Sequence, residues 1–260
     1  MIHAEHLVAR YYGNKVMDDV SIGFEPGLVH SILGPNGCGK STLLKVLSRQ
    51  LQVENGVVYV DGKDAKEWGM KPFARQLAML AQSQERLTDI SVYDLVSYGR
   101  FPHKGFMQRL DEGDRQVVDW ALQLTGMSAL STRSVQELSG GERQRARIAM
   151  AVAQQPKVLL LDEPTTYLDI CHQLEIMELV AHLNRVEQMT IIMVLHELNH
   201  AAAFSDCITV MRRGTIYAQG QPSEVICPKM LRDVFQVDAF VEQEEESGCP
   251  VIKRMKLLTN

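Results

Sequence analysis

Short apolar runs alternate with helix-like stretches along most of this 260-residue chain. Two segments near the N-terminus, 2–8 and 16–24, alternate loosely between apolar and polar residues, as half-buried strands do. Three later runs are mainly apolar, which is typical of strands inside a parallel sheet; they cover 28–33, 158–161 and 190–195. A polar turn and a helix-like run follow each of them. This order predicts an α/β fold with a parallel sheet.

The stretch from about 88 to 156 differs because it is almost wholly helix-like. One helix is predicted to begin at Val92, and a longer one at 111–115, where acidic residues stand in the first turn. We therefore predict a helical subdomain inserted into the α/β core of a domain spanning 1–237. Residues 238–260 form a short tail, in which the acidic run 242–246 is predicted to be a solvated loop.

Composition narrows the class of protein. Hydrophobic residues make up 45% and charged residues 23% of the chain, and the net charge is −5, without a basic stripe. Nucleic-acid binding is therefore not expected. The five cysteines are scattered without a C-x-x-C pair, which suits a reducing cytoplasm and argues against a zinc site. We see neither a signal peptide nor an apolar run that could span a bilayer, so any role at a membrane is expected to come through a partner.

One short stretch carries the strongest chemical signal, since it fits the phosphate-binding pattern G-x-x-x-x-G-K-[ST] between a strand-like and a helix-like run. Its backbone N–H groups and the helix N-terminus are expected to surround the phosphates of a nucleotide. Lys40 would supply a positive charge, and Ser41 a hydroxyl for Mg²⁺. The stretch reads Gly34, Pro35, Asn36, Gly37, Cys38, Gly39, Lys40, Ser41, Thr42.

A second helix start also has the character of an anion site. Ser139 and Glu142 fit the capping box S-x-x-E ahead of an apolar run. Gly140 and Gly141 lie in the first turn, where each costs about 1 kcal/mol relative to alanine. A plain helix cap explains the serine and the glutamate but not the glycines. We therefore expect a ligand to approach this backbone closely.

Polar residues end two of the buried strands, where open α/β sheets bind ligands. Asp162 is expected to bind Mg²⁺ through water, and Glu163 to orient or deprotonate the water that attacks the γ-phosphate. His196 ends another strand in the same way and is expected to contact phosphate.

Together these motifs resemble the ATP-binding subunits of ABC transporters, from about residue 2 to 237. The phosphate loop and Asp162 with Glu163 match the two Walker motifs, and 138–142 matches the ABC signature. The resemblance implies a P-loop NTPase (RecA-like) core with a β-rich N-terminal part and an inserted helical subdomain. It also implies an active ATPase that uses ATP and Mg²⁺. Four further roles follow from the resemblance alone: Gln82 in the glutamine loop, contacting Mg²⁺ and taking part in catalysis; Asp169 in the D-loop; His196 as the switch histidine; and Tyr12 stacking on adenine.

The resemblance further implies a head-to-tail homodimer. ATP would lie between the phosphate loop of one chain and Ser139, Gly140 and Gly141 of the other. The subunit would sit at the cytoplasmic face of the cell membrane, bound to integral permease subunits that receive cargo from an extracytoplasmic substrate-binding protein. The residues we expect to face the permease are Arg86, Val92, Tyr93 and Arg100.

Three segments, 97–103, 165–169 and 195–199, are similar to those of importers of ferric siderophores, haem and cobalamin. The chain has Thr166 and Tyr167 where many family members have Ser-Ala, and Glu197 where this group usually has aspartate. We expect a ferric siderophore as cargo, with haem or cobalamin as alternatives. A soluble ABC-type ATPase of cofactor assembly or DNA repair is a further alternative; the stretch between the Walker motifs lacks the heptads of the repair type.

Overall fold

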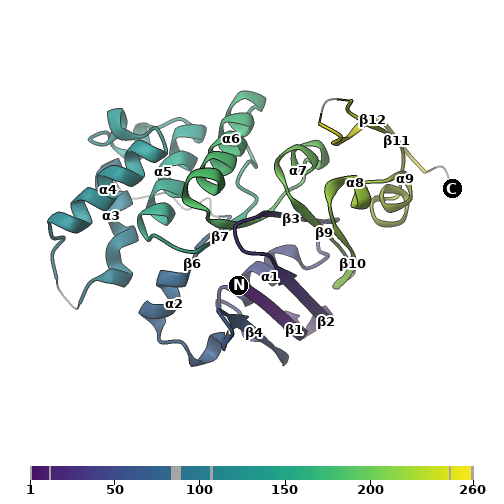
Figure 1. Ribbon diagram of the computed structural model, residues 1–260, viewed down its shortest axis with the longest axis horizontal. Coiled ribbons are helices and arrows are strands. Elements are labelled where there is room, and N and C mark those ends of the chain that lie inside the picture. Colours follow the sequence, from purple (N-terminus) through teal and green to yellow (C-terminus); the bar gives the residue numbers. More distant parts are fainter. Residues whose placement is uncertain (1, 12, 83–88, 106–107, 246, 259–260) are drawn as a thin grey trace. The chain divides into compact units, whose positions relative to one another are not determined.

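The computed structural model describes residues 2–11, 13–82, 89–105, 108–245 and 247–258 (Figure 1). The described chain divides into two compact units. The phosphate-loop unit comprises Met1–Glu67 and Thr190–Asn260, and the helical unit comprises Trp68–Met189. Each unit is described by itself.

The phosphate-loop unit begins with an antiparallel sheet in the order β2-β1-β4-β5. Its strands are β1 (Ile2–Tyr11), β2 (Asn14–Phe24), β4 (Asn55–Val60) and β5 (Lys63–Asp64), followed by the 3₁₀ turn η1 (Ala65–Glu67). Both predicted N-terminal strands are present, and β2 buries Met17, Val20, Ile22 and Phe24 on one side. The loose alternation in the sequence therefore does mark half-buried strands.

A parallel sheet holds the centre of the same unit. Strand β3 (Val29–Leu33) pairs in parallel with β8 (Thr190–Val194) on one side and with β9 (Cys207–Arg212) on the other, and β10 (Thr215–Gly220) pairs with β9. Every residue of β3 and β8 is buried, including the polar residues His30, Ser31 and Thr190, as is typical of strands inside a parallel sheet. Helix α1 (Lys40–Leu47) follows the loop after β3.

The helical unit contains the predicted helices and two parallel strands. In chain order its elements are α2 (Met70–Gln76), β6 (Leu77–Leu80), α3 (Val92–Ser97), η2 (Tyr98–His103), α4 (Glu112–Leu124), η3 (Ser128–Leu130), η4 (Val135–Glu137), α5 (Gly140–Ala153), β7 (Val158–Asp162) and α6 (Ile170–Glu187). Helices α3, α4 and α5 pack on one another (Figure 1). The unit is larger than the predicted subdomain 88–156, because α2, β6 and α6 also pack against these helices and η2.

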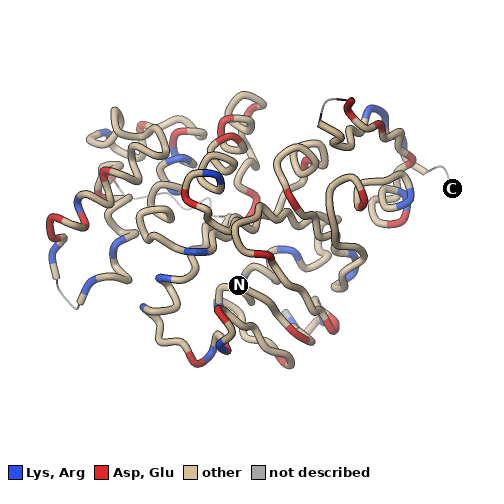
Figure 2. The backbone as a smooth tube through the Cα atoms, in the orientation of Figure 1, with Lys and Arg blue, Asp and Glu red and all other residues tan. Residues whose placement is uncertain are grey.

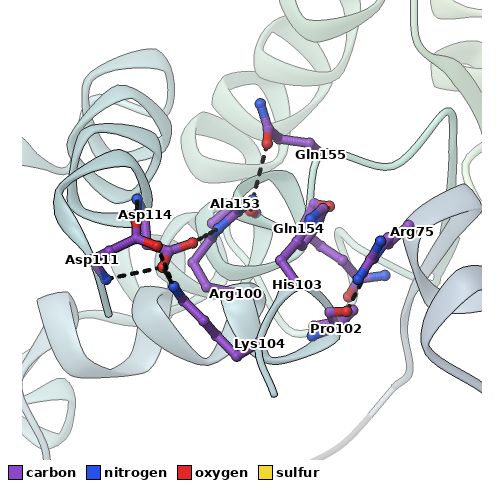
Figure 3. A network of polar contacts seen from close by, with 10 residues as sticks. All are labelled: Arg75, Arg100, Pro102, His103, Lys104, Asp111, Asp114, Ala153, Gln154 and Gln155. Carbon is purple, nitrogen blue, oxygen red and sulfur yellow. Dashed lines mark hydrogen bonds and ion pairs between the residues drawn. The ribbon is translucent and has the colours of Figure 1, made fainter. Parts of the chain in front are cut away.

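A buried ion cluster joins η2 to α4 and α5 (Figure 3). Arg100 donates from Nε to Asp114 Oδ1 at 3.1 Å, and from NH1 to the Ala153 carbonyl at 2.8 Å and to Gln155 Oε1 at 3.0 Å. Lys104 forms ion pairs with Asp111 and Asp114. Arg100 and Asp114 are both buried, so the cluster satisfies charges that would otherwise be costly inside the unit.

The predicted loop in the C-terminal segment is shorter than the acidic run: Glu242 and Gln243 end a strand, whereas Glu244 and Glu245 are exposed outside the strands. Strands β11 (Val237–Gln243) and β12 (Pro250–Leu257) form an antiparallel hairpin, which includes the start of the acidic run in β11. Acidic and basic side chains are interspersed along this hairpin (Figure 2), and Lys253 pairs with Glu242 at 2.6 Å. Cross-strand pairing of opposite charges favours the strands over a loop.

Helix α7 (Leu198–Phe204) connects β8 to β9. Between β10 and the hairpin the chain forms α8 (Pro222–Val225), α9 (Pro228–Met230) and the π-turn η5 (Leu231–Phe235). Among the residues that the structure describes, no helix combines the length and the apolar character needed to cross a membrane.

Candidate nucleotide-binding and hydrolysis site

The phosphate loop lies between β3 and α1, as the sequence predicts. Gly34 has φ +148°, and a Cβ at this position would lie 2.3 Å from the Met211 carbonyl oxygen. Only glycine therefore fits at the entrance to the loop. Asn36 and Gly37 are exposed at its tip, while Ser41 and Thr42 are half-buried in the first turn of α1.

Lys40 is held by the loop itself. Its Nζ donates to the carbonyl oxygens of Gly34 at 2.8 Å and Pro35 at 3.2 Å, and the side chain is buried. The positive charge therefore lies inside the loop. Phosphate oxygens of a bound nucleotide would replace the two carbonyl oxygens as acceptors of its hydrogen bonds. Burial also raises the pKa of the neighbouring Cys38 thiol, which keeps it protonated and unreactive at neutral pH.

His196 belongs to the same edge of the parallel sheet as the phosphate loop. β3 and β8 run in parallel with Ile32 opposite Val194, and the Leu195 N–H donates to the Ile32 carbonyl at 3.3 Å. His196 is the next residue and is exposed. Two strands that end together thus bring the histidine to the edge where the loop begins. Tyr12, expected to stack on adenine, lies outside the described residues.

The helical unit holds the second half of the predicted machinery. β6 and β7 pair in parallel with Leu80 opposite Leu161, so Gln82 and Glu163 follow their ends. Gln82 Nε2 donates to Glu163 Oε2 at 2.6 Å, and Thr166 Oγ1 donates to the same oxygen at 3.1 Å. The structure therefore fixes the carboxylate that the sequence assigned to water activation.

Asp162 ends β7 and is buried. Asp162, Gln82 and Ser41 offer carboxylate, amide and hydroxyl oxygens, which are the hard donors that Mg²⁺ prefers. The residue types therefore fit this ion.

The ABC-signature segment forms the predicted capping box at the start of α5. The Ser139 N–H donates to Glu142 Oε2 at 2.8 Å, and the Glu142 N–H donates to Ser139 Oγ at 3.2 Å. The hydrogen bond from the Ser139 backbone also lowers the pKa of Glu142. Ser139 and Gly140 are exposed, so this helix start is open to a ligand.

Gly141 has a reason for being glycine within the chain itself. A Cβ there would lie 2.0 Å from His172 Cδ2 of α6. The His172 ring is in turn bound to Asp169, since its Nδ1 lies 2.7 Å from Asp169 Oδ1, which also accepts the His172 N–H at 2.9 Å. Packing against His172 therefore gives Gly141 a reason for being glycine that needs no ligand. Asp169 caps α6 in this arrangement, and the backbone hydrogen bond lowers its pKa.

A family model described as "ABC transporter" matches residues 17–166. The iron(3+)-hydroxamate import ATP-binding protein FhuC of Bacillus subtilis (strain 168) is 44% identical over 96% of this chain and 93% of that protein. The chain belongs to the ABC transporter ATP-binding family.

Two further similarities agree with this family. The petrobactin import ATP-binding protein FpuC of Bacillus anthracis is 46% identical over 92% of this chain and 88% of that protein. A solved structure of an inward-facing transporter assigned to the metal-chelate type of ABC transporter has 26% identity and a TM-score of 0.84, covering 99% of this chain and 97% of that chain. The predicted P-loop NTPase fold is thereby confirmed. As an ABC ATPase subunit, the chain binds ATP, and its hydrolysis of ATP is coupled to transport.

Some residues of this ABC ATPase were missed by the sequence analysis. A hollow of about 290 Å³ in the helical unit is lined by Gln82, Glu163 and Thr166 together with Arg143 and Arg147 of α5. The arginines went unnoticed because they stand after the signature at helical spacing and read as a solvated face. Thr166 was noted only as a difference from Ser-Ala, although its hydroxyl donates to the Glu163 carboxylate.

Two of the residues expected to face the permease do not. Val92 and Arg100 are buried, the former in the first turn of α3 and the latter in the ion cluster. Tyr93 is half-buried, and Arg86 lies outside the described residues. Arg100 was misjudged because arginine is mostly a surface residue, and its partners stand far along the chain.

Proposed function

We propose that this chain is the ATPase of an importer of iron complexes, with a ferric siderophore as the class of cargo. The names of its relatives support this class: they are import ATP-binding proteins for iron(3+)-hydroxamate and for petrobactin, at 44% and 46% identity. The two names differ at nearly equal identity, so the proposal extends to the class and not to one siderophore. Haem and cobalamin remain the alternative cargoes to be tested.

The hydrogen bond between Gln82 and Glu163 is the observation that carries the catalytic part of the proposal. In this arrangement one carboxylate oxygen is already occupied by Gln82 and Thr166. A water that attacks the γ-phosphate needs an acceptor on Glu163. Gln82 and Thr166 would orient the Glu163 carboxylate for this water, and the Gln82 amide would also be available as a ligand of Mg²⁺ when the metal–nucleotide complex binds.

The other residues have supporting roles. Lys40 would exchange its loop carbonyls for β- and γ-phosphate oxygens, and His196 would contact the γ-phosphate from the neighbouring strand end. Mg²⁺, held by Ser41, Gln82 and Asp162, would neutralise charge between the phosphates.

A head-to-tail homodimer completes this site. Ser139 and Gly140 are exposed at the N-terminus of α5, which is a favourable place for the γ-phosphate bound to a second copy. Each chain would thus contribute Ser139, Gly140 and Gly141 to the nucleotide of its partner. ATP would favour the closed dimer only through its higher affinity for that state.

The permease would dock on the helical unit and hold the subunit at the cytoplasmic face of the membrane, with a substrate-binding protein on the far side. Tyr98 and Phe101 are 43% and 61% exposed and stack with ring centroids 5.1 Å apart. They line a hollow of about 830 Å³ together with Tyr93 and the basic residues Arg109 and Arg115. An exposed aromatic pair beside basic side chains fits an amphipathic segment of the permease.

The role of Glu163 in hydrolysis is tested with a substitution that removes the charge of its side chain and nearly preserves its shape. Glu163→Gln should retain ATP binding and stabilise the dimer while turnover collapses. The matched control is Glu178→Gln, the same change at an exposed position of α6, which should leave turnover unaltered. Near-normal turnover in Glu163→Gln would remove Glu163 from its assigned role.

Cargo is tested in a host strain that lacks this chain. Growth on a hydroxamate or a catecholate siderophore as sole iron source should return with the wild-type chain and not with Glu163→Gln. Restored use of haem or cobalamin alone would show that the cargo class is wrong. Recovery of soluble proteins without a permease on the tagged chain would favour the cofactor-assembly or repair alternative.

A further inference from the structure

Helix α7 begins two residues after His196 and has little to fix its position by itself. It is seven residues long, and its N-cap residue Glu197 makes no side-chain capping bond. Its buried residues are Ala201 and Ala202, whose small side chains bury little apolar area. A helix this short is marginal on its own, so its position depends on bonds to other elements.

Asn199, in the first turn of α7, makes such bonds to the C-terminal hairpin. Asn199 Oδ1 accepts the Ile252 N–H at 2.9 Å, and Asn199 Nδ2 donates to the Ile252 carbonyl at 3.4 Å. One amide therefore binds both backbone groups of a single residue in β12. Ile252 is 8% exposed, whereas Asn199 is exposed, so both bonds are partly shielded from water on the hairpin side.

The hairpin is in turn fixed to the preceding turn η5. Arg232 pairs with Asp238 of β11 at 2.9 Å, and the same carboxylate pairs with Lys256 of β12 at 3.3 Å. The Leu258 N–H donates to the Gln236 carbonyl at 3.3 Å. Asn199 thus connects α7 to an element that has its own anchors.

The segment around His196 is consequently held from two sides. On the sheet side, the Leu195 N–H is bonded to β3; on the helix side, Asn199 is bonded to β12. We infer that Asn199 is a positioning residue for His196 and that the C-terminal hairpin belongs to the hydrolysis machinery. This inference rests on the γ-phosphate contact proposed above for His196, and no role for Asn199 follows from that proposal alone.

The test measures ATP turnover by the full-length chain. Asn199→Ala should lower kcat about tenfold while KM for ATP stays within about twofold, because the phosphate loop that binds ATP is unchanged. Asn199→Asp keeps the acceptor for the Ile252 N–H and should recover part of the loss. The matched control is Asn184→Ala in the helical unit, which removes a bond of 2.8 Å from an asparagine side chain to the Met189 carbonyl and should leave kcat unchanged.

A change on the hairpin side tests whether the two losses arise from the same bond. Ile252→Pro removes the N–H that Asn199 accepts and should lower kcat as Asn199→Ala does, whereas the double variant should be no worse than either single one. An unchanged kcat in Asn199→Ala, or additive losses in the double variant, would overturn the inference. Normal turnover in His196→Ala would instead refute the proposed role of His196, which distinguishes the two failures.

Discussion

Replacing Gly141 by alanine has two opposing effects on the free energy of unfolding, and the structure indicates the size of each. Alanine favours the helix over glycine by up to about 1 kcal/mol. Against this, the new Cβ would lie 2.0 Å from His172 Cδ2, where ordinary contact begins near 3.4 Å. The His172 ring must therefore move by more than an ångström and give up its bond to Asp169. Overpacking of this kind costs about 1–3 kcal/mol, so the clash should win and Gly141→Ala should be destabilising.

The sign should reverse when the obstacle is removed. In a His172→Ala background the Cβ meets no ring, and Gly141→Ala should then stabilise the chain by up to about 1 kcal/mol. Urea unfolding followed by circular dichroism, without nucleotide, measures both differences. Equal destabilisation in the two backgrounds would refute the steric argument.

ATP turnover of the same variants asks a separate question. If the partner's nucleotide approaches the backbone at this turn, Gly141→Ala should impair hydrolysis in both backgrounds. If turnover recovers together with stability in the His172→Ala background, the glycine serves only the packing of α5 on α6.

Three further predictions concern the helical unit. Arg100→Met removes one partner of a buried ion pair and should lower the free energy of unfolding in urea by about 3 kcal/mol. The control Arg10→Met removes one partner of an exposed ion pair, in which Arg10 Nε lies 2.8 Å from Glu54 Oε2, and should cost less than about 1 kcal/mol. Equal losses would show that burial of the pair does not matter. The hydrogen bond from Lys104 lowers the pKa of Asp111 from 3.8 to about 2, so its stabilising contribution is complete above pH 3.8 and is lost as the pH falls toward 2. Unfolding measured across this range should lose that dependence in Lys104→Met, and a retained dependence would contradict the assignment. Ser139→Arg should abolish hydrolysis while a single chain still binds ATP, and loss of binding by the monomer would contradict the contribution to the partner's site.

The features that could be predicted from the sequence are those fixed by neighbouring residues. The capping box of Ser139 and Glu142 depends on a spacing of three, and the phosphate loop on a strand, a glycine pattern and a helix in direct succession. The structure contains both as predicted. Such patterns are visible because the interacting groups lie within one turn of each other.

The features that could not be predicted depend on residues distant in the chain. Arg100 is buried because Asp114, Ala153 and Gln155 converge on it. No pattern in the residues next to Arg100 indicates this burial. The acidic run in the tail is predicted as a loop along its whole length, but its first residue, Glu242, lies in β11 and pairs with Lys253 of the opposite strand. Charge patterning describes a segment alone, whereas strand pairing is a property of two segments.

Lys40 illustrates what a residue with two functions means for the evolution of the chain. Its ammonium group binds the carbonyls of Gly34 and Pro35, and a substitution would leave both acceptors without that donor. A duplicated gene released from selection for hydrolysis would therefore still be under selection to keep lysine at this position, because loss of the donor would destabilise the loop. Presence of this lysine in a descendant is thus poor evidence that the descendant still hydrolyses ATP, and loss of Glu163 would be the earlier sign of decay.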